Sequence, residues 1–168
     1  MSIVIEKAKT TDAEDILNFT KIIGSETDNL SFGEGGIPIS VDQESSYLKS
    51  IENSNKEIFL IAKDENEIVG TANYSCFSKK RMAHRGEFGI AVKKSYWNQG
   101  IGTMLLEQIL DFAKNVAKSE IVSLEVRSDN KSAIRLYEKF GFKKIGTFKG
   151  YFKINESLVD FDIFELFL

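Results

Sequence analysis

The chain has 168 residues, of which 42% are hydrophobic and 28% charged, and its formal net charge is −3. This composition is typical of a globular protein with one domain over residues 1–168, and the acidic balance disfavours nucleic acid as a partner. No N-terminal stretch resembles a signal peptide, and no apolar run approaches the ~20 residues of a membrane span, so we expect a cytoplasmic protein with no membrane partner.

Cysteine and histidine each occur once. Cys76 cannot form an internal disulfide, which suits a reducing compartment, and its place in a strand-like run favours a buried filler over a nucleophile. With His84 as the only histidine, we expect neither a histidine-built metal site nor a Ser-His-Asp triad. We therefore expect no metal cofactor.

The first third of the chain predicts a strand and two helices. Residues 2–8 alternate like a strand, and Thr11 with Glu14 forms a capping box that opens a helix ending near Gly24. Residues 25–39 look irregular, and loops of this length are often functional. A second capping box, Ser40 with Gln43, predicts the second helix.

The rest of the chain predicts strands separated by two more helices. Residues 57–63 and 68–77 read as a hairpin, residues 121–127 alternate cleanly, and residues 142–168 read as two long strands joined around 155–157. The helix that starts near Ala133 ends at Gly141. The economical fold is α/β, a single mixed sheet with helices on both faces.

A strand, a glycine turn and a helix follow one another over residues 86–117. The apolar run 88–92 leads through Tyr96 and Trp97 into the elbow 98–102, which contains Gly100 and Gly102, and the helix continues from Thr103. Glycine lets a backbone approach a ligand, and the first N–H groups of a helix lack intrahelical partners, so this elbow is a candidate anion site. It is neither a P-loop nor a GxGxxG motif, and a tight turn without a ligand is the alternative.

A second strand-to-helix junction follows at residues 128–130, and its helix places Tyr137 seven residues past Asn130. With both junctions present, the chain resembles the GNAT superfamily of acyl-CoA-dependent N-acetyltransferases. The resemblance lies in GIAVKKSYWNQGIGTMLL and LEVRSDNKSAIRLYEKFGFKKIG, in the central and C-terminal half. It implies a GNAT-like, mostly antiparallel central sheet and acetyl-CoA as the cosubstrate.

The resemblance also implies roles for individual residues. The elbow backbone would hold the coenzyme A pyrophosphate, and the exposed main chain of the preceding strand would pair with the pantetheine arm and polarise the thioester carbonyl. Asn130 would hydrogen-bond the coenzyme arm, and Tyr137 would act as general acid near the sulfur unless it is simply a packed helix residue. Trp97 replaces the family's usual Gln or Arg, so the sequence leaves open what the Trp97 and Gln99 side chains contribute, and packing under the turn is the alternative for Trp97. The implied cofactor-binding residues are Ile90, Ala91, Val92, Asn98, Gln99, Gly100, Ile101, Gly102, Thr103 and Asn130.

Aminolysis of a thioester also needs a base. Amines of the lysine type have a pKa near 10.4, so a carboxylate must take a proton from the attacking amine, directly or through water. Glu125 lies mid-strand, where a buried and unpaired glutamate would be costly without a role, and it matches the base of the ribosomal-protein alanine acetyltransferase branch of the family. Glu87 is the second candidate, with a solvated strand start as its alternative.

These features predict acetyl transfer from acetyl-CoA to a primary amine by direct attack in a ternary complex, the acceptor being a small amine, an amino acid or a peptide N-terminus. A non-catalytic acyl-CoA-binding sensor or scaffold would keep the elbow but would need neither Tyr137 nor a base. A partner-binding α/β domain would leave the elbow empty. The acidic residues of loop 25–39 either attract a cationic acceptor or are solvated, and the apolar end 161–168 either covers a core or joins a second copy in a homodimer.

Overall fold

The computed structural model describes residues 2–168 as seven strands and four α-helices. The strands are β1 (Ile3–Lys7), β2 (Glu57–Asp64), β3 (Glu67–Cys76), β4 (Arg85–Val92), β5 (Ile121–Arg127), β6 (Lys143–Ile154) and β7 (Ser157–Phe167). The helices are α1 (Ala13–Glu26), α2 (Val41–Ile51), α3 (Ile101–Asp111), which continues as a π-turn over Phe112–Val116, and α4 (Lys131–Lys139). The α/β fold predicted from the sequence is confirmed.

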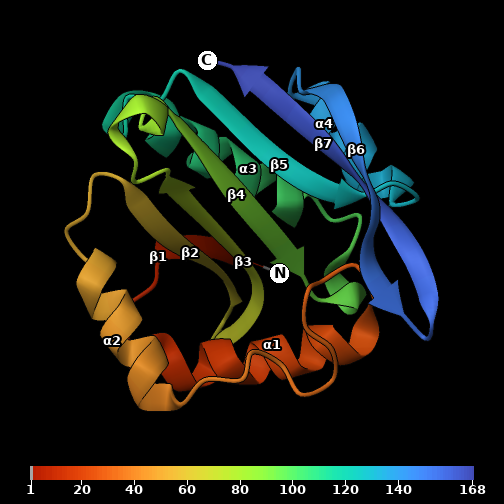
Figure 1. The fold of residues 1–168 in the computed structure, drawn as a ribbon. Helices are drawn as coiled ribbons and strands as arrows, with labels where there is room; N and C mark the ends of the chain where they lie inside the picture. The colour runs from red at the N-terminus through yellow and green to blue at the C-terminus, as the bar shows by residue number, and fades with distance from the viewer. Residues whose placement is uncertain (1) are drawn as a thin grey trace.

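All seven strands form one sheet in the order β1-β2-β3-β4-β5-β7-β6 (Figure 1). Every neighbouring pair is antiparallel except β4 and β5, which run parallel. The parallel pair is joined only where Arg85–Glu87 of β4 lies against 121–123 of β5, and beyond Glu87 the two strands diverge. The sheet therefore opens in its middle.

The two faces of the sheet carry separate cores. Helices α3 and α4 cover one face, where Leu105 and Ile109 pack on Val122 and Leu124 of β5. Helices α1 and α2 cover part of the other face, where Phe19 and other apolar side chains pack on β2 and β3. Because strand residues alternate, the odd-numbered residues of β5 point toward the α1 and α2 face.

The start of α1 differs from the capping box predicted at Thr11. Residues 10–12 form a 3₁₀ turn, and Asp12 accepts the Lys9 N–H at 2.7 Å, because the Asp12 carboxylate is held by Lys63 of β2 at 3.0 Å. The second capping box is confirmed. The Gln43 backbone N–H donates to Ser40 Oγ at 3.1 Å, and the Ser40 backbone N–H donates to Gln43 Oε1 at 2.8 Å.

Helix α1 also runs past its predicted end at Gly24. A Cβ atom at Gly24 would overlap the carbonyl oxygen of Gly33, so this glycine lets residues 27–40 lie against the helix. The Ile37 N–H donates to Thr20 Oγ1 at 3.3 Å and fixes the end of the same loop. The loop is irregular, as predicted, but it is anchored along α1.

The C-terminal strand divides its apolar residues between core and surface. Phe161 and Phe164 are buried, whereas Phe167 is exposed. Cys76, at the end of β3, is partly buried against the core under α3. Within residues 2–168, no helix is both long and apolar enough to cross a membrane.

Candidate active site

The elbow before α3 has the backbone geometry of a ligand-binding turn. Asn98 and Gly100 have left-handed φ values of 60° and 82°, and Gly100 is the N-cap of α3. The first bond of the helix runs from Met104 N–H to the Gly100 carbonyl at 3.0 Å, so the amides of the preceding turn remain for other acceptors. This helix end attracts an anion through its N–H groups and its dipole.

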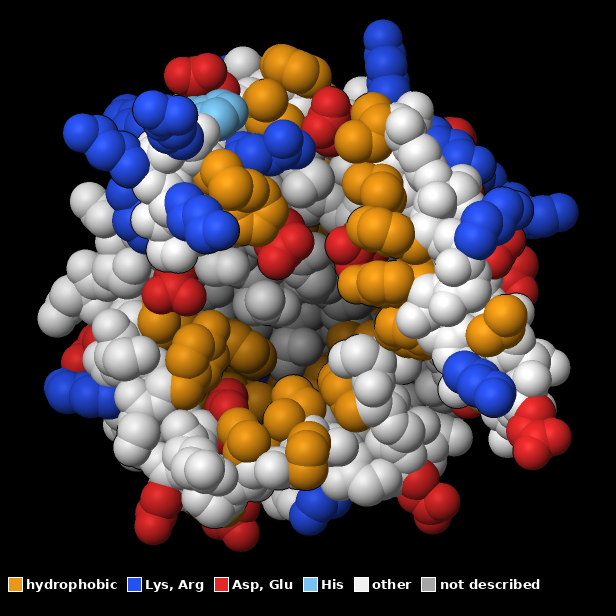
Figure 2. Space-filling model, viewed as in Figure 1, with side chains coloured by type: hydrophobic (Ala, Val, Ile, Leu, Met, Phe, Trp, Pro, Cys, Tyr) orange, Lys and Arg blue, Asp and Glu red, His pale blue; other side chains and the backbone are white. Residues whose placement is uncertain are grey.

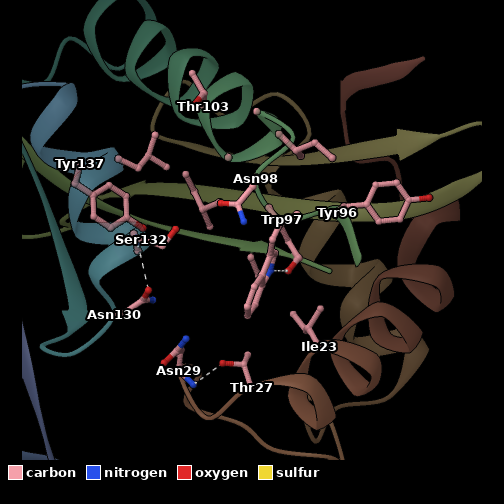
Figure 3. Close-up of a pocket in the computed structure, with 18 of the residues that line it drawn as sticks. Ile23, Thr27, Asn29, Tyr96, Trp97, Asn98, Thr103, Asn130, Ser132 and Tyr137 are labelled. Atoms are coloured by element: carbon pink, nitrogen blue, oxygen red, sulfur yellow. Dashed lines mark hydrogen bonds between the residues drawn. The ribbon is translucent and has the colours of Figure 1, made fainter. Parts of the chain in front are cut away.

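A cavity of about 330 Å³ opens at this elbow (Figure 3). It brings together nearly all of the predicted cofactor-binding residues, from the end of β4, the elbow, and the start of α4, and it also reaches Tyr137. The predicted residues that line it are Ile90, Ala91, Val92, Asn98, Gly100, Ile101, Gly102, Thr103, Asn130 and Tyr137.

The contacts of two residues at the elbow were left open by the sequence. Trp97 is 42% exposed and lines the cavity, and its Nε1–H donates to the Val92 carbonyl at 2.8 Å, so it does not simply pack under the turn. The Val92 carbonyl is thus already bonded, which limits how the end of β4 can pair with a ligand. Gln99 is not among the lining residues, because its side chain turns back to donate to the Ser95 carbonyl at 3.0 Å.

The opposite wall of the cavity comes from α1 and the loop after it, which the sequence motifs do not include. Ile23, Thr27, Asn29 and Leu30 line this side and face the elbow across the cavity. Glu26 at the end of α1 accepts the Lys94 N–H at 2.8 Å and ties the two sides together. The only sequence signal for this wall is the length of the irregular segment, since its acidic residues do not line the cavity.

Tyr137 reaches the cavity from α4. Asn130 begins this helix by accepting the Ala133 N–H at 3.3 Å, and the Tyr137 ring packs edge-on against Phe88 and Phe142 at centroid distances of 5.8 and 6.0 Å. Burial raises the pKa of the Tyr137 hydroxyl to about 12. The hydroxyl is therefore neutral, and able to donate a hydrogen bond, throughout the physiological pH range.

The two candidate bases share a second cavity, of about 260 Å³, on the α1 and α2 face of the sheet. Glu87 of β4 and Glu125 of β5 line it together with Asn73 and Ser75 of β3. Figure 2 shows acidic side chains in the hollow at the centre of this face, with hydrophobic side chains on both sides. Burial, and then the charge of Glu125, raise the pKa of Glu87, which makes Glu87 a stronger base than an exposed glutamate.

The two cavities adjoin at the point where β4 and β5 diverge. Residues 87–89 of β4 line the carboxylate cavity, and residues 90–92 line the elbow cavity. Phe88 lines the carboxylate cavity and also packs on Tyr137, which lines the elbow cavity. The opening in the sheet thus has the Tyr137 hydroxyl on one side and the carboxylates of Glu87 and Glu125 on the other. Among residues 2–168, no group of three or more His, Cys, Asp and Glu side chains is arranged to hold a metal ion.

Comparison with known proteins agrees with this geometry. Residues 27–142 match the profile of the Acetyltransferase (GNAT) family. The chain belongs to the GNAT family. Its backbone superposes on a GNAT-family acetyltransferase from Streptococcus pneumoniae with a TM-score of 0.95 and 28% identity, covering 99% of this chain and 100% of that one. A Salmonella typhimurium protein, yncA, whose structure holds acetyl-CoA, has the same fold with a TM-score of 0.86, 16% identity, and coverage of 100% and 95% of the two chains.

Two GNAT relatives with named activities match a shorter region. The L-amino acid N-acetyltransferase AaaT of Escherichia coli is 31% identical over 60% of this chain and 62% of its own length. The N-alpha-acetyltransferase RimI of Mycobacterium tuberculosis is 33% identical over 56% of this chain and 57% of its own. The match thus spans about 60% of each relative's length. Both the family and the fold that the sequence motifs implied are confirmed.

Proposed function

We propose that the protein transfers the acetyl group of acetyl-CoA to a primary amine within a ternary complex. The observation that carries this proposal is the opening between β4 and β5, because the elbow cavity and the carboxylate cavity are lined there by successive segments of β4, residues 90–92 and residues 87–89. An acyl-CoA-binding sensor, the alternative, has no need for a pair of carboxylates beside the elbow cavity. Both glutamates are exposed rather than buried, so the choice of Glu125 as base rests on its place beside the opening and not on the burial expected from the sequence.

The cofactor would bind through the elbow. The pyrophosphate would accept hydrogen bonds from the N–H groups around Gly100 and Gly102, and the pantetheine arm would follow Ile90 to Val92 toward Tyr137. A main-chain N–H of β4 would donate to the thioester carbonyl as charge develops on its oxygen; one such donor is typically worth about 3–4 kcal/mol. The acetyl-CoA in the yncA structure supports this choice of cosubstrate.

The amine would enter through the carboxylate cavity. Glu125 and Glu87 would hold the ammonium form and accept its proton, and the neutral amine would attack the thioester carbon. The nitrogen, cationic after attack, would give its second proton to the other carboxylate as the C–S bond breaks, and the departing thiolate would accept a hydrogen bond from the Tyr137 hydroxyl. Since a thiol has a pKa of about 8.5, full proton transfer from a hydroxyl with a pKa of about 12 is uphill, so burial favours hydrogen-bond donation as the form of acid assistance.

The names of two relatives support one acceptor class. AaaT is named for L-amino acids and RimI for N-alpha-acetylation. We propose an α-amino group as the acceptor here, carried either by a free amino acid or by a peptide N-terminus.

The test is thiol release from acetyl-CoA across matched amino acids, their amides and short peptides, with both substrate concentrations varied. Amine-dependent release with intersecting initial-rate lines is expected, whereas parallel lines would contradict a ternary complex. If no amine causes thiol release but coenzyme A still binds, the acyl-CoA-binding sensor is favoured. If coenzyme A does not bind either, both the acetyltransferase and the sensor hypotheses are wrong.

A further inference from the structure

Strand β6 contains a bulge opposite the carboxylate cavity. Phe148 pairs with Phe161 of β7, and Phe152 pairs with Val159, so residues 149–151 stand against residue 160 alone. Gly150 has a left-handed φ of 60° in the middle of the bulge. The Asp160 carboxylate accepts the Gly150 N–H at 2.9 Å and the Lys149 ammonium at 3.0 Å. The irregularity is thus fixed by a specific contact.

The bulge changes the side of the sheet on which Tyr151 lies. In a regular strand, residue 151 would face away from residues 148 and 152, because side chains alternate. Here the Tyr151 ring stacks between Phe148 and Phe152, at centroid distances of 4.8 and 5.4 Å and interplanar angles of 16° and 20°. The left-handed glycine therefore turns Tyr151 onto the face that carries Glu125.

From this position the Tyr151 hydroxyl reaches over β7 to β5. It donates to Glu125 Oε2 at 2.8 Å, and among residues 2–168 it supplies the only side-chain hydrogen bond to Glu125. The basic residues on β4 and β5 at this face have other partners, since Arg85 pairs with Glu165 and Arg127 pairs with Asp129. Glu87 is the remaining charged group that faces Glu125 across the cavity.

We propose that Tyr151 is a positioning residue, which the bulge anchored by Asp160 presents to Glu125 so that this carboxylate stays in place beside the opening in the sheet. A carboxylate with one oxygen held presents the other to the incoming amine in a defined direction. The inference rests on the proposed function and adds a residue that lies outside both motifs of the family resemblance.

The first test removes only the hydroxyl. Tyr151→Phe keeps the stacked ring, and we expect kcat to fall about tenfold, the scale of one hydrogen bond to a charged group, with the affinity for coenzyme A unchanged. Tyr47→Phe, an equal change on α2, is the matched control and should leave kcat as it is. An unchanged kcat in Tyr151→Phe would overturn the proposal.

A double-mutant cycle separates positioning from general stabilisation. If Tyr151 acts through Glu125, Tyr151→Phe should change kcat less than about twofold in a Glu125→Gln background. The same tenfold loss in both backgrounds would mean that the hydroxyl acts independently of Glu125, and the proposal would be wrong.

A spectroscopic titration tests the contact without turnover, so that it stays informative if the proposed activity fails. The hydrogen bond donated to Glu125 raises the pKa of Tyr151, since ionisation would forfeit that bond and set two negative charges together. In the tyrosinate absorbance, Glu125→Gln should therefore let one tyrosine titrate at lower pH, and this shift should vanish in a Tyr151→Phe background. If the titration shift persists in the Tyr151→Phe background, or if Glu125→Gln causes no shift, the hydrogen bond from Tyr151 to Glu125 is not formed in solution and the proposal is wrong.

Discussion

The surroundings of Tyr137 and Glu87 shift the pKa of both side chains. Tyr137 sits against Phe88 and Phe142, and desolvation raises the pKa of its hydroxyl to about 12. The same effect, with the added charge of Glu125, raises the pKa of Glu87. The Tyr137 hydroxyl is thus kept as a donor and the Glu87 carboxylate is made more basic, which suits the proposed acid and base.

Replacing Tyr137 with Phe should lower kcat by about 100-fold, the lower end of general acid catalysis, because the departing sulfur loses its donor. The coenzyme A dissociation constant from calorimetry should stay nearly unchanged, since the ring still fills its place. If Tyr137→Phe and the native protein have equal kcat, Tyr137 is not the general acid and is only a packed helix residue.

The pH dependence of kcat should show whether the charge of Glu125 raises the pKa of Glu87. The base must be ionised, and the charge of Glu125 raises the pKa of Glu87. Glu125→Gln removes that charge, so the pKa of Glu87 falls and the acid limb of the residual activity moves to lower pH. If the acid limb of the kcat profile moves to higher pH in Glu125→Gln, the charge of Glu125 does not raise the pKa of Glu87. The Glu87→Gln substitution should remove the acid limb that Glu87 causes.

At the scale of elements, two glycines shape the elbow cavity, which is the proposed coenzyme site. Gly100 turns the chain into α3 with a positive φ, and Gly24 lets the loop lie against α1, so that Thr27 and Leu30 form the opposite wall. Each glycine acts through a different requirement, the first through backbone conformation and the second through close approach.

Gly100→Asp should weaken acetyl-CoA binding about tenfold or more, because it places a like charge at the expected pyrophosphate position. A Cβ atom at this position meets nothing within 4 Å, so the effect is not a clash. Gly100→Ala carries the same backbone strain without charge and is the matched control in calorimetry. If Gly100→Asp binds as tightly as Gly100→Ala, the pyrophosphate does not lie at the elbow.

Gly24→Ala should cost about 1–3 kcal/mol of the free energy of unfolding, because the new methyl group forces the Gly33 carbonyl away from α1. Gly35→Ala, in open space on the same loop, is the control. Urea denaturation of both variants measures the difference, and equal midpoints would show that the loop does not depend on this contact.

For the whole molecule, the features that can be predicted from sequence are those encoded by neighbours along the chain. The alternation of residues 121–127 gives β5 its observed bounds, and the Ser40 capping box starts α2 where predicted. The elbow residues other than Gln99 line one cavity with Asn130 and Tyr137, because each segment follows a strand that ends at the opening of the sheet. Their roles in catalysis remain predictions.

The features that the sequence did not reveal depend on partners far along the chain. Asp12 caps differently from the prediction because Lys63 holds it, and α1 passes Gly24 because a loop packs there. Tyr151 faces Glu125 only because a bulge reverses the strand alternation. No local pattern encodes these contacts.

The central claim is that a coenzyme site and an acceptor site meet through the gap between β4 and β5. Its most direct test is amine-dependent thiol release by the native protein and by the Glu87→Gln/Glu125→Gln double variant, with coenzyme A binding to each measured by calorimetry. We predict equal binding by both proteins and release by the native protein alone. Release by the double variant at the native rate, or native protein that binds no coenzyme A, would contradict the account.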